Sequence, residues 1–190
     1  MSLNHHLGTF MKLLTLSLLS LAFAVGSTQA VQVSSPDIKE GHFMAKTFEF
    51  AGFGCNGANK SPALNWSDLP AGTKSIAVTA YDPDAPTEAG WWHWLVVDMP
   101  VTTSGLVQGA GSAGGTLPLG SRSFTNDFGV KTFGGACPPE GHGMHRYQFT
   151  VWALPDAKLD VPDNANPALV GYMLNAKALA KKTLTATYAR

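Results

Sequence analysis

The sequence of 190 residues predicts a mostly β domain with a small helical part. The main signals are runs of alternating or continuous apolar residues, bounded by turns rich in proline and glycine. The strongest runs are residues 74–81, 92–98 and 145–154. A helical pattern comes late, where Asn166 can cap a helix with Pro167 at its first position. We expect one domain over residues 31–190, with no linker and no internal repeat.

The first half of the chain contains several strand candidates. Residues 31–36 alternate apolar and polar side chains, as an edge strand does. Residues 47–50 and 64–66 are two further short candidates. Residues 74–81 are almost continuously apolar, which predicts burial on both faces, and residues 92–98 are their expected partner.

The second half begins with a glycine-rich segment, residues 105–120, which we expect to be a flexible loop. A strand over 145–154 and a strand-like return over 183–188 lie on either side of the predicted helix. Helical spacing predicts that this helix buries Leu169, Met173, Ala176 and Ala180.

Residues 1–30 have the pattern of a secretory signal peptide. Lys12 precedes a short apolar run, and small residues lead to Ala30, the expected cleavage site. Met11 is a second candidate for the start of translation. The alternatives are an uncleaved membrane anchor and a buried N-terminal helix, although the run is too short to span a bilayer with ease. We therefore expect a periplasmic or secreted protein with no membrane-spanning segment after cleavage.

Charge and cysteine content limit the function classes. The 13 lysine and arginine residues balance the 13 aspartate and glutamate residues, which argues against binding nucleic acid through its phosphates. The two cysteines, Cys55 and Cys137, are expected to form a disulfide in an exported chain. A reactive thiol and a pair of soft metal ligands are the alternatives, but no zinc-site spacing occurs. We expect no metal and no cofactor.

Two proline-containing loops carry the candidate binding residues. Residues 82–86 precede His93, and residues 138–139 precede His145. Proline fixes the backbone φ angle and removes a donor, so each loop should be stiff and each histidine should enter the following strand. Tyr147 lies two residues after His145 and therefore points to the same face of the strand.

If the two strands are neighbours, their polar side chains converge on one recess. The residues concerned are Asp82, His93, His145 and Tyr147. Imidazole and phenol donors suit a phosphate, sulfate or carboxylate group. Asp82 can hold a histidine in one tautomer, or accept a hydrogen bond from an ammonium or hydroxyl group of the ligand.

Several nearby residues have simpler explanations. Trp91, Trp92 and Trp94 fit the core or a pocket wall better than a specific stacking site. His142 and His145 have the spacing of a helical metal pair, but the glycines on both sides of His142 argue against a helix there.

Two motifs in these loops are specific. The first is Asp82-Pro83-Asp84-Ala85-Pro86, followed by Trp91-x-His93. The second is Gly135-x-Cys137-Pro138-Pro139-x-Gly141-x-x-x-His145-Arg146-Tyr147. In this order they resemble the phosphatidylethanolamine-binding protein family, also called the Raf kinase inhibitor protein family, and in particular its exported bacterial members. The resemblance covers nearly all of residues 31–190.

The resemblance implies a large antiparallel sheet packed on a smaller sheet, with one or two peripheral helices near the C-terminus. It also implies an anion pocket at one end of the molecule, where Asp84 shapes the loop. Carried over by motif, the ligand-binding residues are Asp82, Asp84, Trp91, His93, Gly135, Pro138, His145 and Tyr147.

These features favour a binding or regulatory protein that holds a phosphorylated or other anionic headgroup without turning it over. Inhibition of a protein partner, through the pocket rim or residues 105–120, is compatible with this function. The alternative is a hydrolase with an Asp–His pair, although no Gly-x-Ser-x-Gly motif occurs. We assign no catalytic residue, and we expect a monomer or a homodimer that does not bind nucleic acid.

Overall fold

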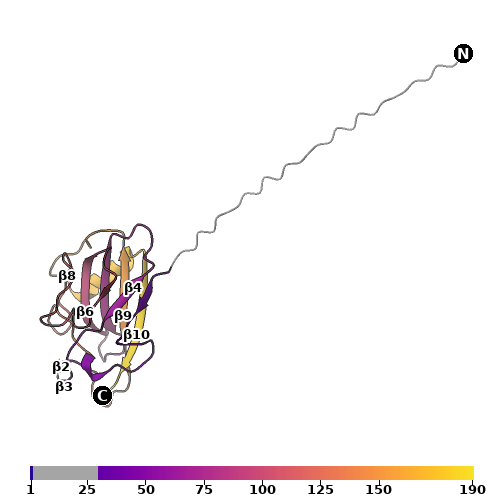
Figure 1. The fold of residues 1–190 in the computed structure, drawn as a ribbon. Coiled ribbons are helices and arrows are strands. Elements are labelled where there is room, and N and C mark those ends of the chain that lie inside the picture. The colour runs from indigo at the N-terminus through magenta and orange to yellow at the C-terminus, as the bar shows by residue number, and fades with distance from the viewer. Residues whose placement is uncertain (2–29) are drawn as a thin grey trace.

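The computed structural model describes residue 1 and residues 30–190, and the signal-peptide prediction lies almost wholly outside these residues. The prediction of a mostly β fold is confirmed. Figure 1 shows the strands gathered in layers, with the C-terminus close to the short hairpin of β2 (Ala51–Gly52) and β3 (Cys55–Asn56).

The large sheet has five antiparallel strands in the order β10-β9-β5-β6-β8. They are β5 (Ser75–Asp82), β6 (Trp91–Pro100), β8 (Arg122–Ser123), β9 (His145–Leu154) and β10 (Ala180–Tyr188). As predicted, β5 is buried along nearly its whole length and pairs with β6. However, β6 and β9 are not neighbours, because β5 lies between them.

A smaller three-stranded sheet packs on one face of the large one. It contains β1 (Gln32–Ser34), β4 (Leu64–Ser67) and β7 (Gly105–Leu106). Leu64 and Trp66 of β4 belong to the same hydrophobic cluster as Val78 and Phe149 of the large sheet. Apolar burial between the two sheets therefore forms the main core.

The opposite face of the large sheet is covered by α1 (Pro167–Lys177). The side chain of Asn166 caps this helix and Pro167 lies in its first turn, as predicted. Val170 and Leu174 join Ala77 of β5 in a second hydrophobic cluster. Since successive residues of a strand face opposite sides, β5 contributes to both clusters.

The predicted helix face is only partly correct, because Met173 is partly buried against the second cluster but the other three predicted residues are not part of the buried face. Leu169 is 39% exposed and Ala180 starts β10, whereas the buried helix residues are Val170, Gly171 and Leu174. A Cβ on Gly171 would lie 2.6 Å from the Trp92 ring, so the helix contacts the sheet through a glycine. A hydrophobic pattern cannot identify such a face, because glycine carries no apolar side chain.

Three other predicted elements also differ. Residues 47–50 were expected to be a strand, but a 3-10 helix, η1 (Lys46–Phe48), occupies this place. The segment 105–120 was expected to be a loop throughout, but it begins with β7. The last strand starts earlier than expected and pairs with residues 145–153 of β9. For β7 and β10 the pairing partner is distant in sequence, so local propensity was not decisive.

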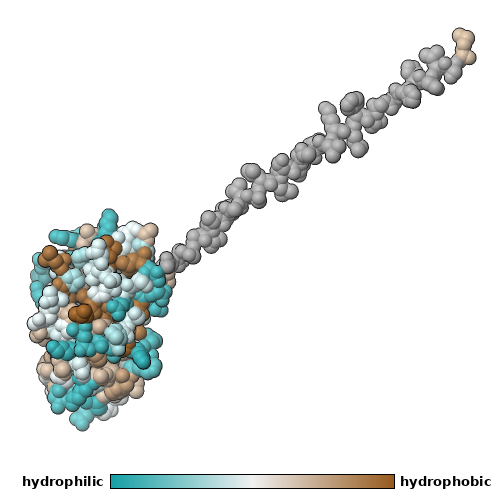
Figure 2. Space-filling model, viewed as in Figure 1, coloured by the Kyte–Doolittle hydropathy of each residue, from teal (hydrophilic) through white to brown (hydrophobic). Residues whose placement is uncertain are grey.

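The surface carries scattered apolar side chains. In the view of Figure 2, hydrophobic residues form separate patches between hydrophilic ones. The large exposed apolar residues include Phe43, Phe53, Val107, Leu119 and Tyr172. Within residues 30–190, no helix has both the length and the apolar character needed to cross a membrane.

Candidate functional site

The candidate site is a cavity of about 250 Å³ at the end of the large sheet where β5 ends and β6 and β9 begin. Polar groups predicted from the sequence line it, namely Asp82, His93, His145 and Tyr147. They come together across β5, although β6 and β9 are not adjacent. Trp91 and Pro138 also line the cavity, as do Phe53 and Phe128.

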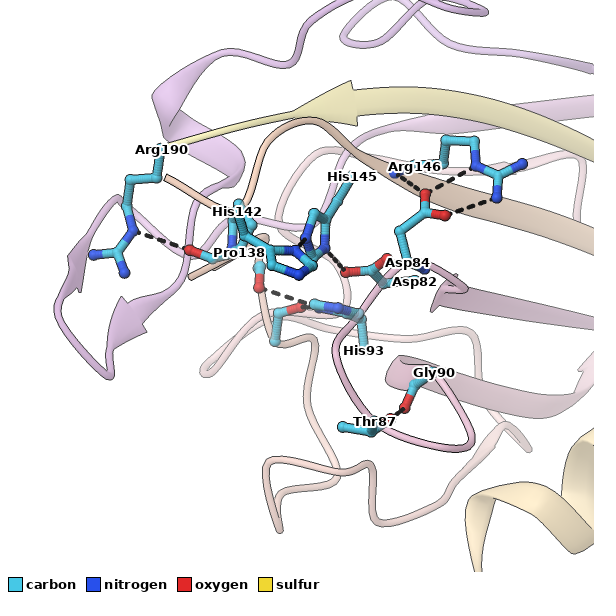
Figure 3. Close-up of polar contacts among 12 residues, drawn as sticks. Asp82, Asp84, Thr87, Gly90, His93, Pro138, His142, His145, Arg146 and Arg190 are labelled. Carbon is cyan, nitrogen blue, oxygen red and sulfur yellow. Dashed lines mark hydrogen bonds and ion pairs between the residues drawn. The ribbon is translucent and has the colours of Figure 1, made fainter. Parts of the chain in front are cut away.

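The loop after β5 is fixed by side-chain hydrogen bonds. Oδ1 of Asp82 accepts from the backbone N–H of Asp84 at 2.8 Å, which closes a tight turn directly after the strand. Further along, the hydroxyl of Thr87 donates to the Gly90 carbonyl at 2.5 Å (Figure 3). Together with the two prolines, these contacts hold the loop against the cavity.

His93 is buried and has one ring nitrogen engaged. Its Nδ1–H donates to the carbonyl oxygens of Gly134 (2.7 Å) and Gly135 (3.1 Å). The opposite nitrogen, Nε2, is buried without a hydrogen-bond partner. Burial lowers the pKa of His93, although the two carbonyls and Asp82 oppose this effect. The neutral ring therefore presents an acceptor at Nε2 and becomes a donor when protonated.

The hydroxyl of Tyr147 is also buried and makes no hydrogen bond of ordinary geometry, although it lies near the Asp82 carboxylate and the Cys137 backbone. Its ring packs edge-on against the ring of His93, with the centroids 5.2 Å apart. Burial, with a contribution from the charge of Asp82, raises the pKa of Tyr147 far above its ordinary value. The group therefore remains a protonated donor near neutral pH.

Unpaired buried polar atoms concentrate at this cavity. In the described part of the chain they are Trp91 Nε1, His93 Nε2, Trp94 Nε1 and Tyr147 Oη. Trp94 lies in the main core, but the other three residues line the cavity. Leaving a buried donor or acceptor unpaired costs about 1–3 kcal/mol, so three at one place make this cavity the candidate ligand site.

His145 has both ring nitrogens engaged. Nδ1 lies 2.7 Å from Oδ2 of Asp82, and Nε2 lies 2.7 Å from Nδ1 of His142. Asp82 and His145 are both almost completely buried, whereas His142 is exposed. The histidine that contacts Asp82, and whose orientation Asp82 can fix, is therefore His145. Figure 3 shows this contact together with the contact between His145 and His142.

Asp84 does not line the cavity but anchors its loop. Its carboxylate accepts from Nε (2.8 Å) and Nη2 (2.7 Å) of Arg146 and from the Arg146 backbone N–H (2.9 Å). These bonds tie the loop after β5 to the start of β9. The hydrogen bond from Arg146 lowers the pKa of Asp84 to about 2.

Gly135 likewise supports the site from behind. Its N–H donates to Oδ1 of Asn59 at 2.7 Å, while its carbonyl accepts from His93. A Cβ here would lie 2.4 Å from the Phe48 carbonyl oxygen, so no other residue fits without a shift of the backbone.

The disulfide predicted between Cys55 and Cys137 is present and lies at the cavity wall. It joins the loop before β9 to the hairpin of β2 (Ala51–Gly52) and β3 (Cys55–Asn56). The tip of this hairpin carries Phe53, whose positive φ of 51° is uncommon for a residue with a side chain. The bridge therefore fixes an aromatic wall of the cavity.

Several contributors to the site were not predicted from the sequence, among them two aromatic rings, an arginine and a histidine. Phe53 and Phe128 line the cavity, and their rings lie 5.9 Å apart. Arg190 donates from Nε to the Pro138 carbonyl (3.1 Å) and from Nη1 to the Gly54 carbonyl (2.7 Å). His142 contacts His145 from outside the cavity. Each contact joins residues without a common local motif, so no sequence signal was available, except that His142 lies inside the second motif.

A larger cavity, of about 500 Å³, lies around Arg122. Its charged groups already satisfy one another. Arg122 donates to Asp98 (2.9 Å), Asp163 (2.9 Å) and the Leu159 carbonyl (2.6 Å). These hydrogen bonds and ion pairs connect segments of the chain to one another, so the charged groups are not free to bind a ligand.

Among residues 30–190, no group of three or more histidine, cysteine or acidic side chains is arranged to hold a metal ion.

The three tryptophans agree with the prediction of core or pocket wall. Trp91 lines the cavity, while Trp92 and Trp94 pack with the two core clusters.

Comparisons with known proteins agree with this geometry. A family model described as phosphatidylethanolamine-binding protein matches residues 34–189. UPF0098 protein YbcL of Escherichia coli (strain K12) is 53% identical over 171 residues, which cover 88% of this chain and 93% of that protein. UPF0098 protein YbhB of the same strain is 44% identical over 158 residues, covering 83% and 99% of the two chains.

The fold comparison gives the same result. The crystal structure of E. coli YbcL, described as a new member of the mammalian PEBP family, matches with a TM-score of 0.81 and covers 84% of this chain and 98% of that chain. This chain therefore belongs to the phosphatidylethanolamine-binding protein family, as its two motifs predicted. Membership of this family implies ligand binding.

The contact between Asp84 and Arg146 gives a direct prediction. Replacing Arg146 with Gln should raise the pKa of Asp84 from about 2 towards the ordinary aspartate value of about 3.9. The stabilisation from this contact is complete above that ordinary value and is lost as the pH falls through about 2. Carboxyl NMR titration measures both variants, with Arg190→Gln as the control. A pKa that stays near 2 in Arg146→Gln would contradict the assignment.

Proposed function

We propose that this protein binds a small anionic ligand, of the phosphorylated headgroup type, in the cavity beside His93 without converting it. The observation that carries the proposal is that His93 Nε2 and the Tyr147 hydroxyl are buried, lack partners and belong to residues of one cavity wall. The proposed ligand-binding residues are those predicted from the motifs, with Asp84 and Gly135 acting as supports.

The chemistry of these groups suits an oxyanion. The Tyr147 hydroxyl is a fixed donor, because its raised pKa keeps it protonated. Protonated His93 provides a second, charged donor, and hydrogen bonds from charged donors are about twice as strong as neutral ones. An anion and a proton are therefore expected to enter together, because each favours the binding of the other.

The remaining walls suit the organic part of such a ligand. Phe53, Phe128 and Pro86 present apolar surface to the cavity. Asp82 adds a buried negative charge, and its oxygens can accept from an ammonium or hydroxyl group. A phosphomonoester with a small amino-alcohol group satisfies all three features.

The hydrolase alternative rests on the Asp82–His145 contact, which resembles an oriented general base. Hydrolysis through a covalent intermediate would also need an activated side-chain nucleophile. Among the lining residues, the Thr87 hydroxyl is committed to the Gly90 carbonyl, and Cys137 is in a disulfide. These commitments favour binding over turnover.

We also propose that the protein acts outside the cytoplasm, in the periplasm or as a secreted protein. The pattern of residues 1–30 supports export, and a disulfide persists best in an oxidising compartment. Regulation of a protein partner fits the exposed rim of the cavity, where Phe53 is 74% exposed.

Anion binding should be visible as thermal stabilisation. At about 100 times its Kd, phosphoethanolamine or inorganic phosphate should stabilise the fold by about 2.7 kcal/mol, which raises Tm by several degrees. His93→Ala and Tyr147→Phe should each reduce this rise strongly, whereas the exposed His42→Ala should not.

Differential scanning fluorimetry at matched ionic strength measures these shifts. An equal rise in all variants would contradict the assigned site. Ester turnover that disappears in His93→Ala would instead favour the hydrolase.

The effect of pH follows from His93. Because burial lowers its pKa in the fold, the unfolded chain takes up this proton first. Stability should therefore fall as the pH drops below about 6.5, by at most about 1.4 kcal/mol per pH unit from this residue. Sulfate, whose charge is constant over this range, should recover the loss by pairing with the imidazolium.

Denaturation with urea at about pH 8 and about pH 5.5 tests this linkage. His93→Gln should show a weaker pH dependence and a smaller effect of sulfate. Identical pH profiles for the wild type and His93→Gln would contradict the prediction.

The exported protein should contain no free thiol. After denaturation without reductant, thiol titration should detect neither Cys55 nor Cys137, because both are in the disulfide. Mass spectrometry of the same sample should find a mature chain that begins near Val31. Two free thiols in protein recovered outside the cytoplasm would contradict this part of the proposal.

A further inference from the structure

His145 is predicted to bind the ligand, yet its two ring nitrogens already have protein partners. Nδ1 faces the Asp82 carboxylate, which accepts hydrogen bonds only, so Nδ1 carries a proton and donates. In the neutral ring, Nε2 is then an acceptor, and Nδ1–H of His142 donates to it over 2.7 Å. The position from which His145 would reach a ligand is therefore occupied by His142.

His142 is held differently from the other histidines of the site. It is exposed and does not line the cavity, whereas His145 is 1% exposed and does. Gly141 and Gly143 flank it with φ values of 74° and 98°, and neither would bring a Cβ within 4 Å of another atom. The turn that lays His142 on His145 thus depends on glycine conformations and is surrounded by open space.

The contact between His142 and His145 excludes a second hydrogen bond at the same nitrogen. Nε2 of an imidazole has one lone pair or one proton and makes one strong hydrogen bond at a time. If an anion accepts from Nε2–H of protonated His145, His142 must give up this nitrogen. The hydrogen bond from Nδ1 of His145 to Asp82, on the other side of the ring, does not involve Nε2 and can hold the ring in place during that exchange.

We propose that His142 is an internal competitor of the ligand, which occupies Nε2 of His145 until an anion displaces it. This inference rests on the proposed function of the cavity and adds a regulatory residue to it. His142 then opposes binding, although it lies next to the site and belongs to the same motif. Its removal should strengthen binding rather than weaken it.

The test is isothermal titration calorimetry of the full mature protein with inorganic phosphate and with phosphoethanolamine. His142→Ala removes the competing hydrogen bond, and His142→Phe removes it while keeping a ring of similar size. Both variants should bind about three- to tenfold more tightly than the wild type, the factor that corresponds to one net hydrogen bond. The exposed His42→Ala is the matched control and should bind like the wild type, and His145→Gln should bind more weakly.

The possible outcomes test the competition by His142 and the proposed function separately. Weaker binding by His142→Ala would make His142 a direct ligand and overturn the competition. Unchanged binding, or tighter binding by His142→Ala alone, would also overturn it, since the hydrogen bond would then not be the cause. If the wild type binds neither probe, the proposed function fails together with this inference. Binding by the wild type without the expected gain in the variants refutes the inference alone.

Discussion

A buried carboxylate organises the site. Asp82 ends the central strand β5 and is 3% exposed, and a charge in this position is costly unless its oxygens are hydrogen-bonded. One oxygen accepts from the Asp84 amide and thereby sets the turn after β5. The other accepts from His145 on β9 and fixes the orientation of that ring. Asp82 thus links the loop after β5 to the neighbouring strand β9 and to the ring of His145.

The rigidity of the sheet allows the site to carry unpaired polar atoms. β5 is bonded to β6 on one side and to β9 on the other, and both sheet faces are covered by hydrophobic clusters. His93 and Tyr147 project from these strands, so their positions do not depend on a mobile loop. The stability lost at Nε2 of His93 and at the Tyr147 hydroxyl is offset by the core.

Local sequence was sufficient for the long central strands β5, β6 and β9 and for most of the cavity. The run at 74–81 identified β5 because burial on both faces leaves a continuous apolar signal. The two proline motifs identified the cavity residues because turn, histidine and strand follow one another directly. Contacts between segments that are distant in the chain could not be predicted from the sequence. Examples are the wall formed by Phe53 and Phe128, the bonds of Arg190 to Pro138 and Gly54, and the intervening position of β5 between β6 and β9.

The disulfide connects the geometry of the cavity with the compartment proposed for the protein. The hairpin that carries Phe53 has two residue pairs and belongs to neither larger sheet, so strand pairing alone holds it weakly. Its attachment to the rest of the wall includes the Cys55–Cys137 bond and the hydrogen bond from Arg190 to Gly54. A covalent link is stable under oxidising conditions and is lost in a reducing cytosol. The aromatic wall is therefore expected to be complete only where the proposed export delivers the protein, so the proposed binding site depends on the proposed signal sequence.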